Sequence, residues 1–168
     1  MTLHSLPFVP NDSERKLAKF EDTVANALIL DLEDAVTSEH KPAARELARA
    51  FPTLPRTGAR KRPWVRINAL NTRDSRIDLA AIVAARPCGL MVPKVDHASE
   101  LINIGADLDS LEAQAGIAVD ATHLIPMLES PQAVLTVADY LRTHLDRVSG
   151  NSWGAKNIGA SIGNQETI

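Results

Sequence analysis

Charged side chains stand at or near the C-terminal ends of four short apolar runs in this 168-residue sequence. They are Asp31, Glu33 and Asp34 in run 27–34, Arg66 in run 64–70, Lys94 in run 89–95 and Glu129 in run 123–130. Carboxylate oxygens are preferred ligands of Mg²⁺, and an arginine suits an anionic substrate. The set therefore indicates a divalent metal and an anionic substrate. The alternative is that each charge only solvates the end of a strand.

The apolar runs alternate with stretches whose apolar residues recur at helical spacing. The strand-length runs are 6–10, 27–34, 64–70, 89–95, 123–130 and 148–154, and the helical stretches are 13–24, 41–51, 78–85, 99–114 and 131–145. Runs rich in Val, Ile and Leu are typical of parallel strands buried on both faces. About six strand–helix units in a row favour an open doubly wound sheet or a (βα)8 barrel. Both folds place their chemistry at the C-terminal ends of the strands.

Composition excludes several classes of function. The net charge of −3 and the aromatic content of 4% give no basis for nucleic-acid binding. No stretch approaches the roughly 20 apolar residues of a membrane span. No dinucleotide-binding or P-loop glycine motif occurs, and the histidines lack the spacing of a zinc site. We expect one cytoplasmic domain over residues 1–168.

Seven segments in order resemble the citrate lyase β-subunit-like family, which includes citryl-, malyl- and citramalyl-CoA lyases and related hydroxy-oxo-acid aldolases. They are FVPNDSERK, LILDLEDAV, KPAAR, VRINAL, MVPKV, MLESPQAV and SWGAKNIGASIG. The resemblance implies a TIM (βα)8-type barrel and a Mg²⁺-dependent carbon–carbon lyase of aldol or Claisen type, acting on a small carboxylic acid or an acyl-CoA. Such barrels typically take about 250 residues. We therefore expect an incomplete barrel of about six βα units, truncated at its C-terminus.

The resemblance also implies roles for individual residues. Arg66 matches the substrate arginine, which holds a carboxylate or thioester oxygen and stabilises the enolate formed on cleavage. Glu129 matches the first metal-binding carboxylate and so contacts the substrate through the metal. Glu33 and Asp34 match acidic positions that order the arginine and the metal-bound waters, and with Arg66 they form the expected catalytic set. Lys94 matches a frequent lysine that we place among the substrate-binding residues, with its role open.

One departure concerns the metal. The family usually reads W-G-A-E-D-L where this chain has WGAKNI, residues 153–158. The aspartate that would be the second metal ligand is therefore Asn157, and Lys156 adds a positive charge beside it. An amide oxygen can still contact Mg²⁺ but brings no charge, so the sequence predicts weak or absent Mg²⁺ binding at Glu129 and Asn157.

Two functions stay open. The first is a citrate-lyase-β-like lyase, and the alternative is a non-catalytic or truncated relative that binds a small acid or a partner subunit. Six parallel strands cannot close as an eight-stranded barrel does. We therefore expect open edges at 6–10 and 148–154, an uncovered apolar inner face and a homo-oligomer that covers them. The basic loop 56–62 is either solvated or an anion contact.

Overall fold

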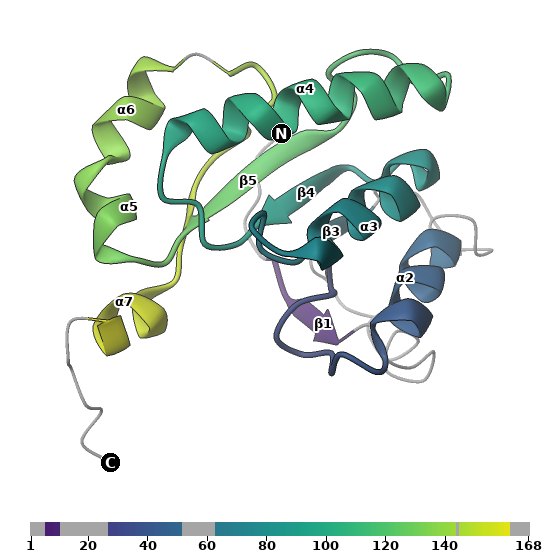
Figure 1. Cartoon of the computed structure of the whole chain (residues 1–168), viewed down its shortest axis with the longest axis horizontal. Helices are drawn as coiled ribbons and strands as arrows, with labels where there is room; N and C mark the ends of the chain where they lie inside the picture. The colour runs from purple at the N-terminus through teal and green to yellow at the C-terminus, as the bar shows by residue number, and fades with distance from the viewer. Residues whose placement is uncertain (1–5, 11–26, 52–62, 144, 162–168) are drawn as a thin grey trace.

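Six parallel strands form a single sheet in which sequence order is spatial order (Figure 1). The computed structural model of the chain describes residues 6–10, 27–51, 63–143 and 145–161. The strands are β1 (Phe8–Pro10), β2 (Ile29–Asp31), β3 (Trp64–Arg66), β4 (Gly89–Val92), β5 (His123–Leu128) and β6 (Ser152–Trp153). Each lies inside one of the apolar runs, so the predicted series of strands is confirmed. Strands β1 and β6 are the two edges of this half-barrel.

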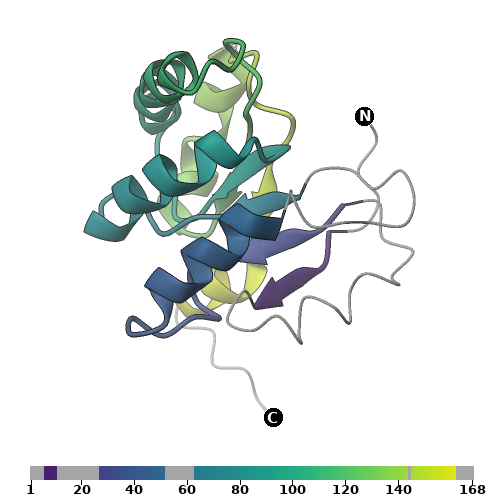
Figure 2. The same cartoon turned by 90° about the vertical axis from the view of Figure 1, so that its right-hand side faces the viewer.

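The helices follow the strands along the chain. They are α2 (Lys41–Ala50), α3 (Arg73–Ile82) with the 3-10 turn η2 (Val83–Ala85), α4 (Ala98–Gln114), α5 (Pro131–Leu135), α6 (Val137–Arg142) and α7 (Ala155–Ser161). Helices α2, α3 and α4 lie against one face of the sheet (Figure 2). The predicted helix 13–24 and the basic loop 56–62 lie outside the described residues. Within the described part of the chain, no helix is long and apolar enough to cross a membrane.

Several helix boundaries differ from the predicted ones, and in two cases a side chain that caps the helix explains the difference. Helix α4 begins at Ala98 rather than Ser99, since His97 and Glu100 form a capping box there. Helix α3 begins at Arg73, five residues before the predicted stretch, because the Thr72 hydroxyl accepts the N–H of the third helical residue. The predicted helix 131–145 is two short helices, α5 and α6.

Alternate strand residues face two apolar clusters, as a parallel sheet requires. Leu30, Val65 and Leu90 join the large cluster between the sheet and the helices. Ile29, Trp64, Met91, Ile125 and Met127 belong to the smaller cluster on the inner face. The register Ile29–Trp64–Gly89–His123 aligns one row of residues across four strands.

The inner face is not the uncovered apolar patch that the sequence predicts. Met91 is 1% exposed and Met127 is 6% exposed, because the inner side chains pack against one another. Gly89 makes this packing possible. A Cβ at Gly89 would lie 2.4 Å from the Trp64 ring and 2.5 Å from the His123 carbonyl oxygen, so only glycine lets the indole lie across β4.

A buried arginine ties helix α4 to the start of β5, at the end of the sheet away from the C-terminal strand ends. Arg147 is 6% exposed and forms ion pairs with Glu112, Asp109 and Asp120. The Glu112 carboxylate is fully buried and accepts four hydrogen bonds, two from Arg147 and two from the N–H groups of Asp120 and Thr122. We call these five residues the base cluster.

Candidate functional site

Arg66 and Asp31 form a buried two-bond pair where β3 and β2 end. The register places them directly opposite one another. Arg66 Nε donates to Asp31 Oδ1 at 2.8 Å and Nη2 donates to Oδ2 at 2.6 Å. The Phe8 ring covers the guanidinium, with its centroid 4.8 Å from Arg66 Cζ. This leaves Nη1 as the guanidinium nitrogen outside the pair, so Asp31 fixes which edge of Arg66 faces the rim.

Glu33 lies beside this pair and contacts two cations. Its Oε1 accepts from Lys94 Nζ at 2.8 Å, and its Oε2 lies 3.1 Å from Arg66 Nη1. The Arg66 contact is an ion pair without hydrogen-bond geometry, so Oε2 is a buried oxygen with no hydrogen-bond partner. Burial raises the pKa of Glu33 and outweighs Lys94 and Arg66, which lower it. Asp34 is more exposed and lies 3.5 Å from Arg66 Nη1.

Glu129 follows β5, and each of its carboxylate oxygens accepts a hydrogen bond from a different segment. Its Oε2 accepts the Lys94 backbone N–H at 3.1 Å, and its Oε1 accepts Asn157 Nδ2 at 2.9 Å. The close approach of the β6–α7 connection depends on Gly154, where a Cβ would lie 2.6 Å from Glu129 Cγ. Gly154 is therefore needed for close packing, because a side chain just before α7 would collide with Glu129.

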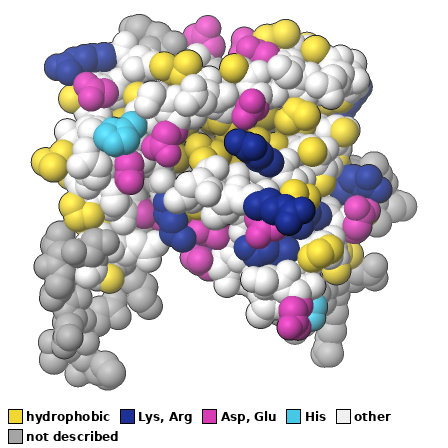
Figure 3. All heavy atoms as spheres, viewed as in Figure 1, with side chains coloured by type: hydrophobic (Ala, Val, Ile, Leu, Met, Phe, Trp, Pro, Cys, Tyr) yellow, Lys and Arg dark blue, Asp and Glu magenta, His cyan; other side chains and the backbone are white. Residues whose placement is uncertain are grey.

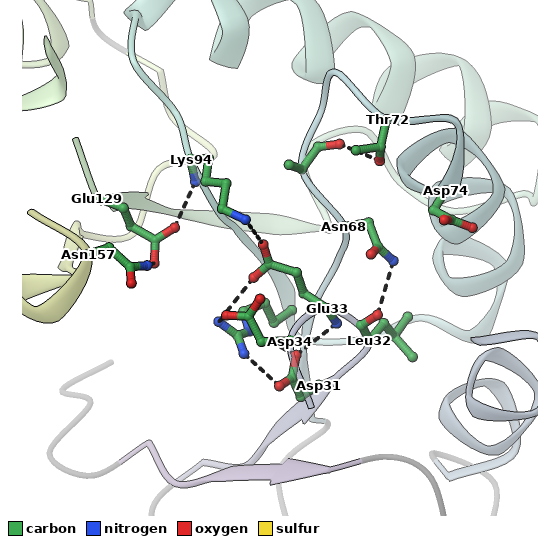
Figure 4. Close-up of polar contacts among 12 residues, drawn as sticks. Asp31, Leu32, Glu33, Asp34, Asn68, Thr72, Asp74, Lys94, Glu129 and Asn157 are labelled. Atoms are coloured by element: carbon green, nitrogen blue, oxygen red, sulfur yellow. Dashed lines mark hydrogen bonds and ion pairs between the residues drawn. The ribbon is translucent and has the colours of Figure 1, made fainter. Parts of the chain in front are cut away.

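The predicted site residues are therefore linked in space. Figure 4 shows contacts that run from Asn157 through Glu129 and Lys94 to Glu33. The series continues from Glu33 to Arg66 and from Arg66 to Asp31. We call this set, with Asp34, the rim cluster. Its members come from β2, β3 and the segments that follow β2, β4 and β5, and Asn157 comes from helix α7. The side chain of Lys156 lies outside the described part of the chain. The roles of the cluster members in binding and catalysis stay predictions.

Sequence reasoning gave no role to Asp78, which binds Asn68 and so helps to position the segment before Glu33. Asp78 is fully buried and accepts from Arg45 Nε at 2.6 Å and from the Asn68 backbone N–H at 2.8 Å. The Asn68 side-chain amide also donates to the Leu32 carbonyl oxygen at 3.1 Å, which holds the chain just before Glu33. The available signal was a carboxylate next to Leu79 on the inward face of a predicted helix.

The residues present fit Mg²⁺ only weakly. The rim cluster holds four carboxylates and two cations, and this excess negative charge favours a further cation. The amide of Asn157, however, directs its nitrogen at Glu129, where a shared ion would need oxygen. Among the described residues, no three His, Cys, Asp or Glu side chains gather as metal ligands. An ion would therefore rest on Glu129, on the Asn157 oxygen after the amide turns over, and on water.

Comparison with known proteins gives a consistent family assignment. A family model described as HpcH/HpaI aldolase/citrate lyase matches residues 4–168. The (3S)-malyl-CoA thioesterase of Cereibacter sphaeroides is 32% identical over 96% of this chain and 52% of that protein. The citrate lyase subunit beta-like protein of Mycobacterium tuberculosis is 30% identical over 93% of this chain and 49% of that protein. The chain thus spans about half the length of these curated relatives.

Solved structures match the half-barrel. The citrate lyase beta subunit of M. tuberculosis, complexed with oxaloacetate and magnesium, has a TM-score of 0.73 at 29% identity and covers 95% of this chain and 61% of that chain. Protein CitE of M. tuberculosis in complex with magnesium, acetoacetate and coenzyme A has a TM-score of 0.72 at 28% identity, over 97% of this chain and 52% of that one. The expected partial TIM barrel is confirmed. The chain belongs to the HpcH/HpaI aldolase/citrate lyase family.

Proposed function

We propose that the rim cluster binds a small carboxylic acid or its CoA thioester and supports carbon–carbon bond cleavage or formation of aldol or Claisen type. The observation that carries the proposal is the convergence of Glu33, Lys94 and Glu129 at the C-terminal strand ends (Figure 4). Arg66 joins them through its contact with Glu33. This rim is the edge at which barrel enzymes place their chemistry. The whole reaction is inferred for a chain half as long as its curated relatives.

The geometry gives each side chain a task. In cleavage, the substrate hydroxyl loses its proton, the carbon–carbon bond breaks, and its electron pair forms an enolate that takes a proton at carbon. Arg66, held by Asp31, would direct Nη1 at the carboxylate or thioester oxygen and stabilise the enolate. Glu33 suits proton transfer because burial raises its pKa toward neutrality. Mg²⁺ held by Glu129 and Asn157 would polarise the acid oxygens.

Product formation tests this function directly. The chain is incubated with (3S)-malyl-CoA or citramalyl-CoA and Mg²⁺, and the released glyoxylate or pyruvate is measured as its hydrazone. We expect turnover that Arg66→Met and Glu129→Gln each abolish, with an exposed-pair variant, Arg142→Met, as the control. Release of free CoA without an oxo acid would indicate thioester hydrolysis instead. Turnover unchanged in Arg66→Met would contradict the proposed site.

A second candidate, acid binding without turnover, is favoured by the hydrogen bond between Asn157 and Glu129. We expect Asn157→Asp to strengthen Mg²⁺ binding by at least about tenfold, since it restores a negative charge beside Glu129. Calorimetry with MgCl₂ measures this, with Glu129→Ala as the variant that removes binding. If the unmodified chain binds Mg²⁺ as tightly as Asn157→Asp does, the charge argument is wrong.

We also propose a homo-oligomer, on the basis of the two edge strands alone and not of an uncovered inner face. The inner face is buried, but the edge strands β1 and β6 carry the exposed aromatic residues Phe8 and Trp153. Light scattering at low micromolar concentration tests this. A stable, cooperatively melting monomer would contradict it.

A further inference from the structure

Lys94 has a backbone conformation that L-residues rarely adopt. Its φ is +54°, in the left-handed region that favours glycine. Such strain persists where the surroundings enforce it. Pro93 precedes it, and the buried Val95 follows, with its N–H bonded to the Met127 carbonyl and its carbonyl oxygen accepting the Tyr140 hydroxyl at 3.0 Å. The left-handed turn is therefore held on its C-terminal side by the two hydrogen bonds of Val95.

This turn lets one residue contact two separate carboxylates. The Lys94 N–H points to Glu129 Oε2 at 3.1 Å, and the Lys94 side chain reaches across the rim to Glu33 Oε1 at 2.8 Å (Figure 4). Glu129 belongs to the part of the rim that holds Asn157, and Glu33 belongs to the part built on Arg66. A glycine would relieve the strain but would remove the ammonium group.

We propose that Lys94 is a positioning residue that couples the two parts of the rim cluster, holding Glu129 through its backbone N–H and Glu33 through its ammonium group. The inference rests on the proposed acid-binding function of this rim. Glu33 is 8% exposed, and its two oxygens contact the Lys94 ammonium and the Arg66 guanidinium, so these two cations together hold the carboxylate in place.

Three substitutions separate the two contacts. Lys94→Met removes the charge and keeps the strain, Lys94→Gly removes both, and Lys94→Arg keeps a cation. In ¹³C spectra of the ligand-free chain at one pH, we expect the Glu33 carboxyl signal to shift in the Met and Gly variants and to be restored by Arg. The Glu129 signal should stay, because the N–H remains. In Glu129→Gln, the amide proton signal of Lys94 should move instead.

Thermal melting reports the strain. We expect Lys94→Gly to melt at least about 2 °C above Lys94→Met, because only glycine adopts this backbone without cost. Arg86, also left-handed at φ +56° but exposed and away from the rim, provides the matched control. Arg86→Gly should raise the melting temperature and leave the Glu33 signal unchanged. A Glu33 signal unchanged in Lys94→Met, or a glycine variant that melts below the methionine variant, would overturn the proposal.

Binding of oxaloacetate with Mg²⁺, measured by calorimetry, connects the coupling to function. We expect the Met and Gly variants to bind about tenfold more weakly than the unmodified chain, and the Arg variant to recover most of the affinity. If the unmodified chain binds no oxaloacetate, the proposed function fails, while the carboxyl signals and melting temperatures still decide the role of Lys94.

Discussion

The base cluster and the rim cluster are both built around a buried arginine, but they differ in how completely their polar atoms are paired. In the base cluster, both oxygens of Glu112 accept two hydrogen bonds each, and Arg147 contacts three carboxylates. In the rim cluster, Glu33 keeps a buried oxygen without a hydrogen bond. Left-handed backbone occurs in both clusters, at Lys94 with φ +54° and at Asp120 with φ +63°.

This difference separates a structural network from a candidate site. The Glu112 carboxylate, fully buried and fully paired, is closed to a ligand, and such a satisfied buried network contributes rigidity. The rim cluster differs in its incompletely paired Glu33 carboxylate, whose pKa burial raises, and such groups cluster at functional sites. Figure 3 shows acidic and basic side chains side by side over much of one face of the molecule, so charge alone would not have distinguished the two clusters.

The largest expected effect comes from breaking the base cluster. Arg147→Met leaves the fully buried Glu112 carboxylate without its cation, and we expect the free energy of unfolding to fall by about 3–5 kcal/mol. Urea denaturation measures the change. Arg142→Met, which removes an exposed ion pair with Asp139, should have no measurable effect. Equal losses in the two variants would remove the distinction between the buried network and a surface pair.

A smaller effect concerns stability: the contributions of Glu112 and Glu33 to the free energy of unfolding should depend on pH in opposite directions. Burial alone would raise the pKa of Glu112, but the contacts with Arg147 and Thr122 outweigh burial and lower the pKa. The Glu112 carboxylate therefore stabilises the fold at neutral pH, and this contribution is lost as pH falls through the folded pKa. The pKa of Glu33 is raised above 4.5, so its stabilising contribution is present below that pH and lost as pH rises through the folded value.

Two conservative variants measure this contrast by denaturation between pH 4 and pH 8. Glu112→Gln should lose about 1–3 kcal/mol at neutral pH and approach the unmodified chain as pH falls. Glu33→Gln should gain stability relative to the unmodified chain as pH rises. Parallel pH profiles for the two variants would show that the clusters do not differ as described.

The smallest effect concerns the anchor beside Lys94. Tyr140→Phe removes the hydrogen bond to the Val95 carbonyl, and we expect a loss of about 1 kcal/mol in unfolding free energy. Burial, with the nearby Glu100 and Asp96 carboxylates, raises the pKa of Tyr140 to about 12. Tyr140 is the only tyrosine, so ultraviolet absorbance follows its titration without interference. A titration near 10 in the folded chain would show that this anchor is not buried.

Much of the fold was predictable because it depends on local patterns. Apolar runs located all six strands that the structure describes, and polar residues at their ends indicated the rim that holds Arg66, Glu33 and Glu129. The seven segments identified the family, which the match over residues 4–168 confirms. These signals lie within single elements, so no knowledge of three-dimensional contacts was needed.

The contacts between elements could not be predicted from such patterns. The pairing of Asp31 with Arg66 depends on the register of two strands, and Arg147 meets Glu112 across 35 positions of sequence. The direction of the Asn157 amide depends on what Glu129 accepts, which is a property of the folded site. The filled inner face follows from the fit of the Trp64 indole over Gly89, which composition does not show.

The contrasting settings of the two tryptophans have a spectroscopic consequence. Trp64 is 2% exposed in the inner face, and Trp153 is 56% exposed on β6, next to the glycine that packs on Glu129. Their fluorescence should therefore separate, with short-wavelength emission from Trp64 that acrylamide quenches poorly and long-wavelength emission from Trp153 that it quenches readily. In Trp64→Phe, the remaining emission would come from the β6 edge alone, where ligand binding at the rim or contact with a second chain would change its colour and intensity.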